Sequence, residues 1–399
     1  MRILTLSPRQ CWPPLSGAKL RDYYFARALG RRADVTYAQF TEPGAKLLSG
    51  SDLPFCRKVI PVPKPKAYTP GKIARGLTGR WPLSVVNYVS EAMVEALEQA
   101  TRGERFDLVY LEGIHMAGYV DPLARMFGAW PRVVNDWHNI ESELMRRYRA
   151  RTPLHGAYAR LTARQLEWVE RRQLEKGFGN VVCSERERAQ LAAIAPQARI
   201  AVVENGVDTE YFAATAAARA PGTSVVYVGS MDYHPNIDAV TFFAREIWPT
   251  VRNRLPSCRL VIVGAKPAPA VVALGQVEGV EVTGTVPDVR PYYRDALAAI
   301  VPLRTGGGTR LKILEAMAAG VPVVSTALGA EGLVVEPDRH LAIVEADDAD
   351  AWGRALERLA GDGAWARELT GAALARVRER YDWAILGESL GRTFEDWLG

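Results

Sequence analysis

Short apolar runs alternate along the whole chain with longer segments in which apolar residues recur every three or four positions. A short β-branched run bounded by turn residues predicts a strand, and a period near 3.6 predicts a helix. In the first half, strands are expected at residues 2–6, 35–38, 58–62, 108–111, 132–135, 181–183 and 200–203. In the second half, they are expected at residues 225–228, 260–263, 280–283, 299–302, 321–325 and 342–344. The amphipathic segments include 19–29, 84–100, 236–254 and 350–359, and residues 140–176 predict one or two arginine-rich helices.

Repeated strand–helix–strand order is typical of parallel sheets covered by helices on both faces. A single core stops growing at roughly 250–300 residues, so a chain of 399 residues should form two domains. The stretch FAATAAARAPG has little core material and follows a turn at Asn205-Gly206, which places a linker at residues 209–221. The predicted fold is α/β, with two doubly wound, Rossmann-like parallel sheets facing a cleft. A ligand would lie in that cleft, at the carboxyl ends of the strands.

The composition, with 48% hydrophobic and 24% charged residues, is that of an ordinary soluble protein. No run reaches the ~20 apolar residues that span a bilayer, and the N-terminal residues read as a first strand. We therefore expect neither a membrane span nor a secretion signal. The cysteines form no CxxC pair, which favours a reducing cytoplasm and no metal site. They are Cys11, Cys56, Cys183 and Cys258.

Positive charge is concentrated in the first half of the chain. Residues 1–185 hold 28 Lys and Arg against 18 Asp and Glu, whereas residues 186–399 hold 22 against 27. From Arg57 to Arg80 there are seven basic residues and no acidic one, interleaved with Tyr68. A basic half indicates an anionic partner, such as phospholipid, a lipid pyrophosphate or nucleic acid, although a solvated loop face accounts for any single residue.

The stretch GGGTRLKILEAMAAGVPVVST, residues 306–326, is the strongest candidate for chemistry. It reads as a glycine loop, a helix that ends at Gly320, and a buried strand. Glycines at a helix start let backbone N–H groups approach an anion, and the helix dipole favours negative charge there. Arg310 and Lys312 add positive charge at the same place, and Glu315 adds a carboxylate. The alternative is a well-capped helix with solvated basic residues.

Two further loops follow predicted strands and carry glycine. SPRQCWPPLSGAKL places Gly17 just before a helix, a second candidate anion site, but it lacks the GxGxxG fingerprint of dinucleotide-binding folds. VYVGSMDYHPNIDAV places Gly229 and Ser230 at a strand end, where glycine permits close approach of a ligand. A plain turn between a strand and a helix explains the second loop equally well.

Other strand ends carry irregular backbone or polar side chains. In VTGTVPDVRPYY, the backbone around Val286 could hydrogen-bond a flat heterocycle, while Asp288 is better suited to capping the next helix. VVNDWHNIESELMRR places His138 where a strand ends and a helix begins, which favours a role in the cleft. Glu112 and His115 occupy the same class of position. Asp136, Asn139 and Glu141 cluster with His138, although Asn139 with Ser142 could equally cap the helix.

Several catalytic and metal motifs are missing from the sequence. The pair Asp348 and Asp350 forms a DxD spacing, but it lies in an acidic run that opens a helix, so favourable charge at a helix N-terminus is the better explanation. No Ser-His-Asp spacing, HExxH or P-loop is present.

Taken in order, the motifs resemble a known family. VENGVDTEYF, GSMDYHPNIDAV, TGTVPDVRPYY and PLRTGGGTRLKILEAMAAGVPVVST are similar to those of B-type glycosyltransferases, specifically the retaining family 4 enzymes. SPRQCWPPLSGAKLRDYYFARAL and DWHNIESELMRR resemble bacterial exosortase-associated sugar transferases of exopolysaccharide loci. The resemblance implies an acceptor-binding domain at residues 1–208, the linker at 209–221, a nucleotide-sugar domain at 222–380, and a return helix on the first domain at 381–399.

The resemblance also implies residue roles. Glu315 matches the glutamate that binds the nucleotide ribose, and the helix start from Gly308 to Arg310 matches the phosphate cradle. Gly17 matches the glycine of a phosphate loop in the first domain, and Val286 matches the backbone that contacts the base. The candidate donor-binding residues are Gly17, Gly229, Ser230, Val286, Arg304, Gly307, Gly308, Thr309, Arg310, Leu311, Lys312 and Glu315. The candidate catalytic residues are His138, Glu315 and Arg310.

Two positions depart from the family pattern. Family 4 enzymes usually carry two glutamates eight positions apart, and the first, which touches the donor sugar, falls on Gly307 here. The usual Arg and Lys pair of the loop after Gly229 is also missing, since GSMDYHPN has neither residue. We expect Arg304, Arg310 and Lys312 to supply that positive charge.

The resulting hypothesis is transfer of a sugar from a UDP- or GDP-linked donor to a hydroxyl acceptor with retained anomeric configuration. Helix dipoles, glycine N–H groups and basic side chains would stabilise the leaving diphosphate, so neither a metal nor a cofactor is expected. The basic first half favours a polyprenyl-pyrophosphate-linked acceptor, cytoplasmic location with peripheral contact at the inner membrane face, and no nucleic acid partner. The alternatives are a nucleotide-sugar epimerase or hydrolase, and a non-catalytic nucleotide-sugar-binding scaffold.

Overall fold

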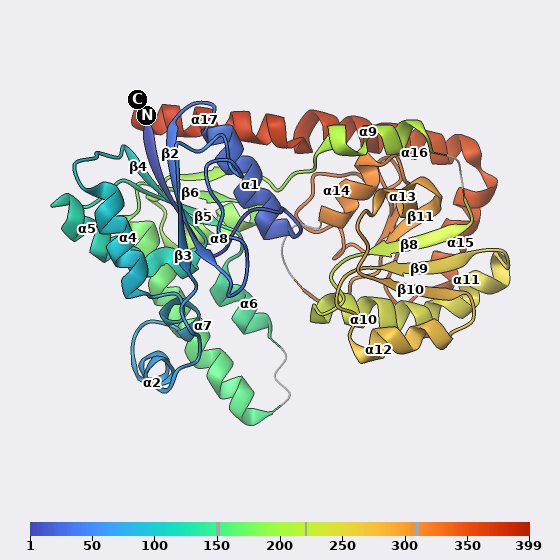
Figure 1. The fold of residues 1–399 in the computed structure, drawn as a ribbon. Helices are drawn as coiled ribbons and strands as arrows, with labels where there is room; N and C mark the ends of the chain where they lie inside the picture. The colour runs from blue at the N-terminus through green and yellow to red at the C-terminus, as the bar shows by residue number, and fades with distance from the viewer. Residues whose placement is uncertain (149–151, 220–221, 307–310) are drawn as a thin grey trace. The chain divides into compact units, whose positions relative to one another are not determined.

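The computed structural model describes residues 1–148, 152–219, 222–306 and 311–399 (Figure 1). The chain divides into two compact units, Met1–Glu204 with Leu386–Gly399, and Asn205–Ile385. The last helix, α17 (Trp383–Leu398), carries the chain from the second unit back to the first and occupies the segment predicted to return there. In the first unit it meets α1 (Gly17–Leu29), because a side chain at Gly387 would overlap Ala28. Both termini lie in the first unit (Figure 1).

The first unit is built on a seven-stranded parallel sheet with the order β3-β2-β1-β4-β5-β6-β7. Its strands are β1 (Arg2–Ser7), β2 (Asp34–Thr41), β3 (Lys58–Pro63), β4 (Leu108–Glu112), β5 (Val133–Trp137), β6 (Gly179–Val182) and β7 (Ile200–Val202). Besides α1, its helices are α2 (Pro70–Thr78), α3 (Leu83–Val86), α4 (Glu91–Thr101), η1 (Ile114–Tyr119), α5 (Val120–Phe127), α6 (Glu141–Arg147), α7 (Pro153–Lys176) and α8 (Glu185–Ile194). The order of the strands reverses between β1 and β4.

The second unit repeats this plan with a six-stranded parallel sheet in the order β10-β9-β8-β11-β12-β13. Its strands are β8 (Ser224–Val228), β9 (Arg259–Val263), β10 (Val280–Gly284), β11 (Ala296–Val301), β12 (Val323–Ser325) and β13 (Ala342–Ile343). Its helices are α9 (Thr209–Ala217), α10 (His234–Phe242), η2 (Phe243–Ile247), α11 (Trp248–Arg254), α12 (Pro269–Val272), η3 (Ala273–Gln276), α13 (Arg290–Arg294), α14 (Leu311–Ala318), α15 (Ala349–Gly361), α16 (Gly363–Arg376) and η4 (Val377–Tyr381). Here the order reverses between β8 and β11.

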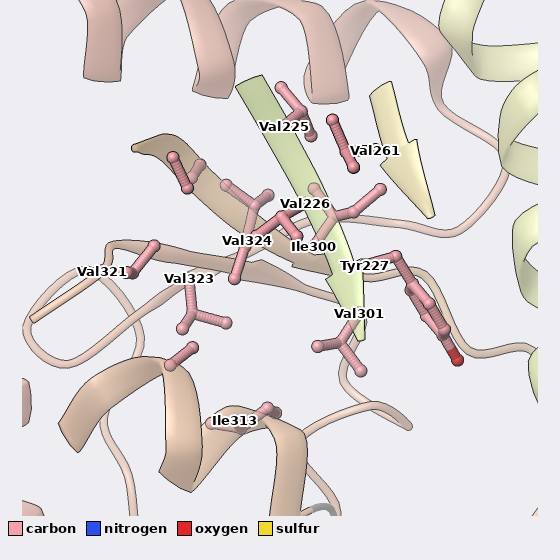
Figure 2. Close-up of a cluster of buried hydrophobic side chains, with 14 of the residues drawn as sticks. Val225, Val226, Tyr227, Val261, Ile300, Val301, Ile313, Val321, Val323 and Val324 are labelled. Carbon is pink, nitrogen blue, oxygen red and sulfur yellow. The ribbon is translucent and has the colours of Figure 1, made fainter. Parts of the chain in front are cut away.

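Burial on both faces explains why the strands of the second unit read as valine-rich runs. Val226, Ile300 and Val324 come from three adjacent strands and are buried together, and Ile313 of α14 packs in the same core (Figure 2). Helices on both faces leave no polar side to such a sheet, so its strands show continuous apolar runs. Burying each side chain of this size contributes about 1.5–3 kcal/mol. All thirteen predicted strands are present, with ends shifted by a few residues.

The predicted linker at residues 209–221 is wrong for most of its length, because residues 209–217 form α9. Asp208 caps this helix by accepting from the Tyr211 N–H at 2.8 Å. Phe212 is buried in the core of the second unit, and the alanines that seemed to lack core material are good helix formers. The boundary between the units falls instead after Glu204.

Two long helices expected from periodicity are interrupted. The segment 84–100 is split into α3 and α4, because the backbone between them bonds elsewhere: Ser90 N–H donates to the Tyr119 hydroxyl at 3.0 Å. The segment 236–254 contains the π-helical turn η2 just before Pro249, which lacks the N–H that a regular helix needs at that position.

Candidate functional site

In the second unit, the predicted donor-binding residues follow the strand ends where the order reverses. Gly229 and Ser230 follow β8, Arg304 follows β11, and Lys312 lies in the first turn of α14. In doubly wound sheets, the carboxyl ends of the strands at such a reversal are where ligands bind. Gly307, Gly308, Thr309 and Arg310 lie outside the described residues, so their predicted roles stay predictions.

The Lys312 ammonium group lies against the loop that follows β8. Its Nζ donates to the Tyr227 hydroxyl at 2.5 Å and to Asn236 Oδ1 at 2.9 Å, and it sits 4.0 Å from the centre of the Tyr227 ring. A Cβ added at Gly229 would be 3.0 Å from the same Nζ. Lys312 and Gly229, predicted separately from two motifs, therefore meet at one place.

Glu315 lies one turn further along α14 and is half-buried. Burial raises the pKa of its carboxyl group, and the Lys312 ammonium opposes part of that rise. Among the described residues, no side chain or backbone group hydrogen-bonds this carboxylate. A half-buried carboxylate that lacks a protein donor is costly, so the group is suited to accept hydrogen bonds from a ligand.

Arg304 and Leu311, two further candidates in the second unit, already have partners within the protein. Arg304 pairs with Asp238 of α10, with Nη2 at 2.7 Å from Oδ1, and it stacks on Phe242 with Cζ 3.8 Å from the ring centre. Its charge is therefore matched by a carboxylate. Leu311 packs against the hydrophobic core of the second unit.

The loop after β10 contains Val286 and Asp288. Val286 is half-buried against the core, and β10 ends at Gly284 with a φ of +70°. Asp288 accepts from the Arg290 N–H at 2.9 Å and from the Tyr211 hydroxyl at 3.1 Å, but the N-cap position of α13 is Val289, so Asp288 precedes the cap instead of occupying it. These bonds tie the predicted base-contacting loop to α9.

In the first unit, a row of polar residues crosses four strands at their carboxyl ends. Ser7 of β1 is in register with Gln39 of β2, and Glu112 of β4 is in register with Asp136 of β5. All four are buried. Polar residues in register at the strand reversal mark the corresponding ligand-binding edge of this sheet.

Asp136 is held by a fully buried ion pair with Arg21 of α1. Arg21 Nη2 lies 2.7 Å from Oδ1 and Nε lies 2.8 Å from Oδ2, while the Tyr110 hydroxyl donates to Oδ2 at 2.8 Å. Arg21 also donates to the carbonyl oxygens of Val203 and Glu204. Burial alone would raise the pKa of the Asp136 carboxyl, but the Arg21 charge and these hydrogen bonds hold it below its usual value.

His138 follows β5 and is placed beside two carboxylates. Its Nε2 lies 3.1 Å from Asp22 Oδ1 and 3.7 Å from Asp136 Oδ2. The other oxygen of Asp22 is paired with Arg9 Nη1 at 3.1 Å. The His138 side chain is 13% exposed and that of Arg9 is 26% exposed, whereas that of Asp22 is fully buried, so the imidazole and the guanidinium are the groups open to a ligand. Gly17 begins the helix that carries Asp22.

Glu112 is fully buried in the first unit, and His115 is partly buried. Glu112 accepts from the Tyr37 hydroxyl at 2.7 Å, and burial raises the pKa of its carboxyl well above the usual value. Burial lowers the pKa of His115 to about 4, so its imidazole is neutral near pH 7. Neither side chain is well placed to meet a ligand, and both support the strand ends from within.

Five residues of these arrangements were missed by sequence reasoning: Arg9, Arg21, Asp22, Tyr227 and Asn236. Asp22 sits in an amphipathic helix among arginines, where a single sequence suggests a solvated charge. Tyr227 reads as one more apolar residue of β8, and Asn236 as a residue of a helix start. A usable signal was the adjacent pair Arg21-Asp22 on the apolar face of a predicted helix, because buried charges are almost always paired.

Metal-binding clusters do not occur in the described part of the chain: no three His, Cys, Asp or Glu side chains there could hold an ion together. Asp348 of the DxD spacing caps α15, accepting from the Ala351 N–H at 2.8 Å, as its place in the sequence suggests. The four cysteines are buried and form no disulfide.

Comparison with known families gives a match in each half of the chain. Residues 16–211 match the family described as Glycosyltransferase Family 4, and residues 222–362 match the family described as Glycosyl transferases group 1. The chain is 28% identical over 251 residues to a phosphatidyl-myo-inositol mannosyltransferase of Mycolicibacterium smegmatis, covering 59% of this chain and 61% of that one. It is 28% identical over 152 residues to a lipopolysaccharide core mannosyltransferase of Rhizobium leguminosarum, covering 38% and 43%. The chain thus spans about half the length of these curated relatives.

Solved structures share the fold over the full chain. A sucrose-phosphate synthase of Thermosynechococcus elongatus has a TM-score of 0.73 at 20% identity, over 99% of both chains. Anabaena HepE, solved with UDP and glucose, has a TM-score of 0.67 at 16% identity, also over 99% of both chains. At sequence identities this low, the similarity shows the fold alone, which is the B-type glycosyltransferase fold of two parallel-sheet α/β units.

Proposed function

Because the chain belongs to the family 4 glycosyltransferases of B-type fold, we propose that it moves a sugar from a nucleoside diphosphate donor to a hydroxyl acceptor with retained anomeric configuration. The base of the donor is uracil or guanine. The family resemblance supports retention, and a product of inverted configuration in an NMR assay would exclude it.

The observation that carries this proposal is that α14 places a cation, Lys312, and a carboxylate, Glu315, one turn apart. Lys312 presents a cation at the end of β8, and Glu315 presents a half-buried carboxylate one turn later. A cation beside a helix start suits the diphosphate, and a carboxylate that lacks a donor in the described protein suits the two ribose hydroxyls. The two groups thus match adjacent parts of one nucleoside diphosphate.

The chemistry of the proposed reaction centres on the leaving diphosphate, which gains negative charge as the bond to the sugar breaks. Lys312 and the N-terminal dipole of α14 stabilise that charge without a metal ion, provided they are fixed before the reaction starts. In the first unit, His138 is a partly exposed member of a charged network, and we assign it to assistance at the sugar.

The proposed acceptor is a lipid-linked glycan in exopolysaccharide or other cell-surface polysaccharide synthesis. The matched relatives are named for phosphatidyl-myo-inositol and for the lipopolysaccharide core, both parts of lipid-anchored molecules. The net positive charge of residues 1–185 favours an anionic acceptor such as a polyprenyl-pyrophosphate-linked glycan. We further propose that the protein works at the inner face of the cell membrane.

Membrane contact is supported by two acid-free segments that touch each other in the first unit. Residues 53–90 and 144–166 hold thirteen basic residues and no acidic one. Gln165 of α7 joins them by donating to the carbonyl oxygens of Gly76 and Gly79 at 2.8 and 2.7 Å. Both segments expose large apolar side chains: Tyr68, Ile73, Leu77, Leu154 and Tyr158. Within the described ranges, no helix is both long and apolar enough to span a bilayer.

Reversing two exposed charges on this surface should weaken binding to anionic vesicles by about 30-fold or more, since each basic residue near such a surface contributes about 1 kcal/mol. The variant is Lys66→Glu/Arg75→Glu, assayed by co-sedimentation with phosphatidylglycerol-containing liposomes. Its control is Arg245→Glu/Arg354→Glu, which makes the same charge change on the exposed surface of the second unit. Equal losses in both variants would mean that net charge, not this surface, drives binding.

Replacing Glu315 by alanine tests the donor site. Loss of hydrogen bonds to a charged group costs about 1.5–3 kcal/mol, so donor affinity should fall roughly 10- to 100-fold in calorimetric titrations with UDP- and GDP-sugars. The exposed Glu210→Ala variant of the same unit serves as the control. Unchanged affinity in Glu315→Ala would remove Glu315 from the site.

Nucleotide release assays separate the proposed function from its alternatives. A transferase releases nucleoside diphosphate only when a lipid-linked acceptor is present. Release of UDP or GDP without acceptor would indicate a hydrolase, and conversion of the donor without release would indicate an epimerase. Donor binding without turnover over all acceptors would indicate a scaffold.

A further inference from the structure

We infer that Tyr227 and Asn236 are positioning residues, which fix the Lys312 ammonium at the end of β8 as the diphosphate-binding cation of a loop that has neither lysine nor arginine. This inference rests on the proposed function, and it adds two residues to the site together with a mechanism for both. It is carried by the contacts around Lys312.

The loop itself supplies neither a lysine nor an arginine. Residues 229–236 read GSMDYHPN and contain neither Lys nor Arg, while Asp232 adds a negative charge that the Ser230 hydroxyl contacts at 2.6 Å. Lys312 comes from a helix 76 residues further along the chain than Asn236 and fills this place. Glycine at position 229 is what makes room, because a Cβ there would lie 3.0 Å from Lys312 Nζ and 2.9 Å from Asn236 Nδ2.

Tyr227 and Asn236 are themselves held in place by hydrogen bonds. Tyr227 is fully buried in β8, and its hydroxyl points away from the valine cluster of the core (Figure 2). That hydroxyl donates to Asn236 Oδ1 at 2.7 Å. The amide of Asn236 is oriented from its other end, where Nδ2 donates to the Ser230 carbonyl oxygen at 2.8 Å. Two oxygen acceptors and one aromatic face therefore meet the ammonium group in fixed positions.

The Tyr227 hydroxyl and the Asn236 amide oxygen are neutral acceptors that orient the Lys312 ammonium. Arg304, by contrast, is bound by the carboxylate of Asp238. A flexible lysine held in this way loses its side-chain freedom before the ligand arrives, and such pre-organisation increases affinity for an anion.

The test measures binding of ligands that differ only in phosphate. Uridine, UMP and UDP, with guanosine, GMP and GDP in parallel, are titrated against wild-type protein and against Lys312→Met, Tyr227→Phe, Asn236→Ala and the double variant Tyr227→Phe/Lys312→Met. We expect Lys312→Met and Tyr227→Phe each to weaken diphosphate binding about tenfold, in line with hydrogen bonds to a charged group, while nucleoside binding stays unchanged. The double variant should bind UDP or GDP no more weakly than Lys312→Met.

The double variant separates positioning from a general structural role, because a residue that acts through Lys312 has no further effect once Lys312 is removed. Tyr233→Phe, an exposed tyrosine of the same loop, is the matched control, and thermal melting shows that each variant is folded. Additive losses, or equal losses for nucleoside and diphosphate, would overturn the inference while leaving the proposed function in place. Wild-type protein that binds neither UDP nor GDP would overturn the proposed function, and the inference with it.

Discussion

Arg21→Ala is expected to destabilise the first unit by about 3–5 kcal/mol, because it leaves a buried charge without its partner. Arg21 and Asp136 are each about 1% exposed, and the guanidinium donates to both carboxylate oxygens. It also satisfies two backbone carbonyl oxygens near the end of the unit, at Val203 and Glu204. Urea denaturation monitored by tryptophan fluorescence would record the loss.

Two comparisons make this stability prediction specific. Arg27→Ala removes an exposed arginine from the same helix and should change stability by no more than about 0.5 kcal/mol. Arg21→Met/Asp136→Leu removes both charges and should be more stable than the sum of the single losses. If Arg21→Ala behaves like Arg27→Ala, the buried pair does not hold this unit together.

Acid should reduce the effect of Arg21→Ala. The pKa of Asp136 is held below its usual value in the folded protein, so this carboxylate stabilises the wild type above the usual Asp pKa of about 3.9, and the contribution is lost as the pH falls further. In the variant, the unpaired carboxylate is relieved by taking up a proton. The stability difference between the two proteins should therefore be largest near neutral pH and shrink toward acid.

The strands could be predicted because a parallel sheet buried on both faces leaves continuous β-branched runs, such as Val225 and Val226 in β8. The helices were less certain, since tertiary hydrogen bonds decide where they stop. The Tyr119 hydroxyl, for example, accepts from the Ser90 N–H and donates to the Tyr88 carbonyl oxygen. One predicted helix is divided into two at this point. Alanine-rich α9 was misread because low side-chain volume resembles a linker, although the same residues favour helix.

The candidate site was predictable only in part, because a sequence shows local signals and not contacts between distant residues. Glycine at strand ends and a basic helix start are local signals, so Gly229 and Lys312 could be proposed from their own motifs. Their contact could not, because it joins distant parts of the chain. Asp22 was missed since nothing local distinguishes a buried carboxylate from a solvated one, and its partners Arg9 and His138 lie on other elements.

Replacing His138 by alanine should lower kcat by about 10²–10⁴-fold, the range for loss of a positioned proton-transfer group, and should leave donor affinity nearly unchanged. The reason is geometry: Asp22 and Asp136 approach the imidazole from the protein side, and the 13% of its surface that is exposed is the part a substrate can reach. Steady-state kinetics with a lipid-linked acceptor, paired with donor titrations, would separate kcat from binding. Gln99→Ala, which shortens an exposed side chain of α4 in the same unit and outside the proposed membrane-contact segments, is the control. An unchanged kcat in folded His138→Ala would show that the network around Asp22 serves structure alone and that His138 takes no part in the reaction.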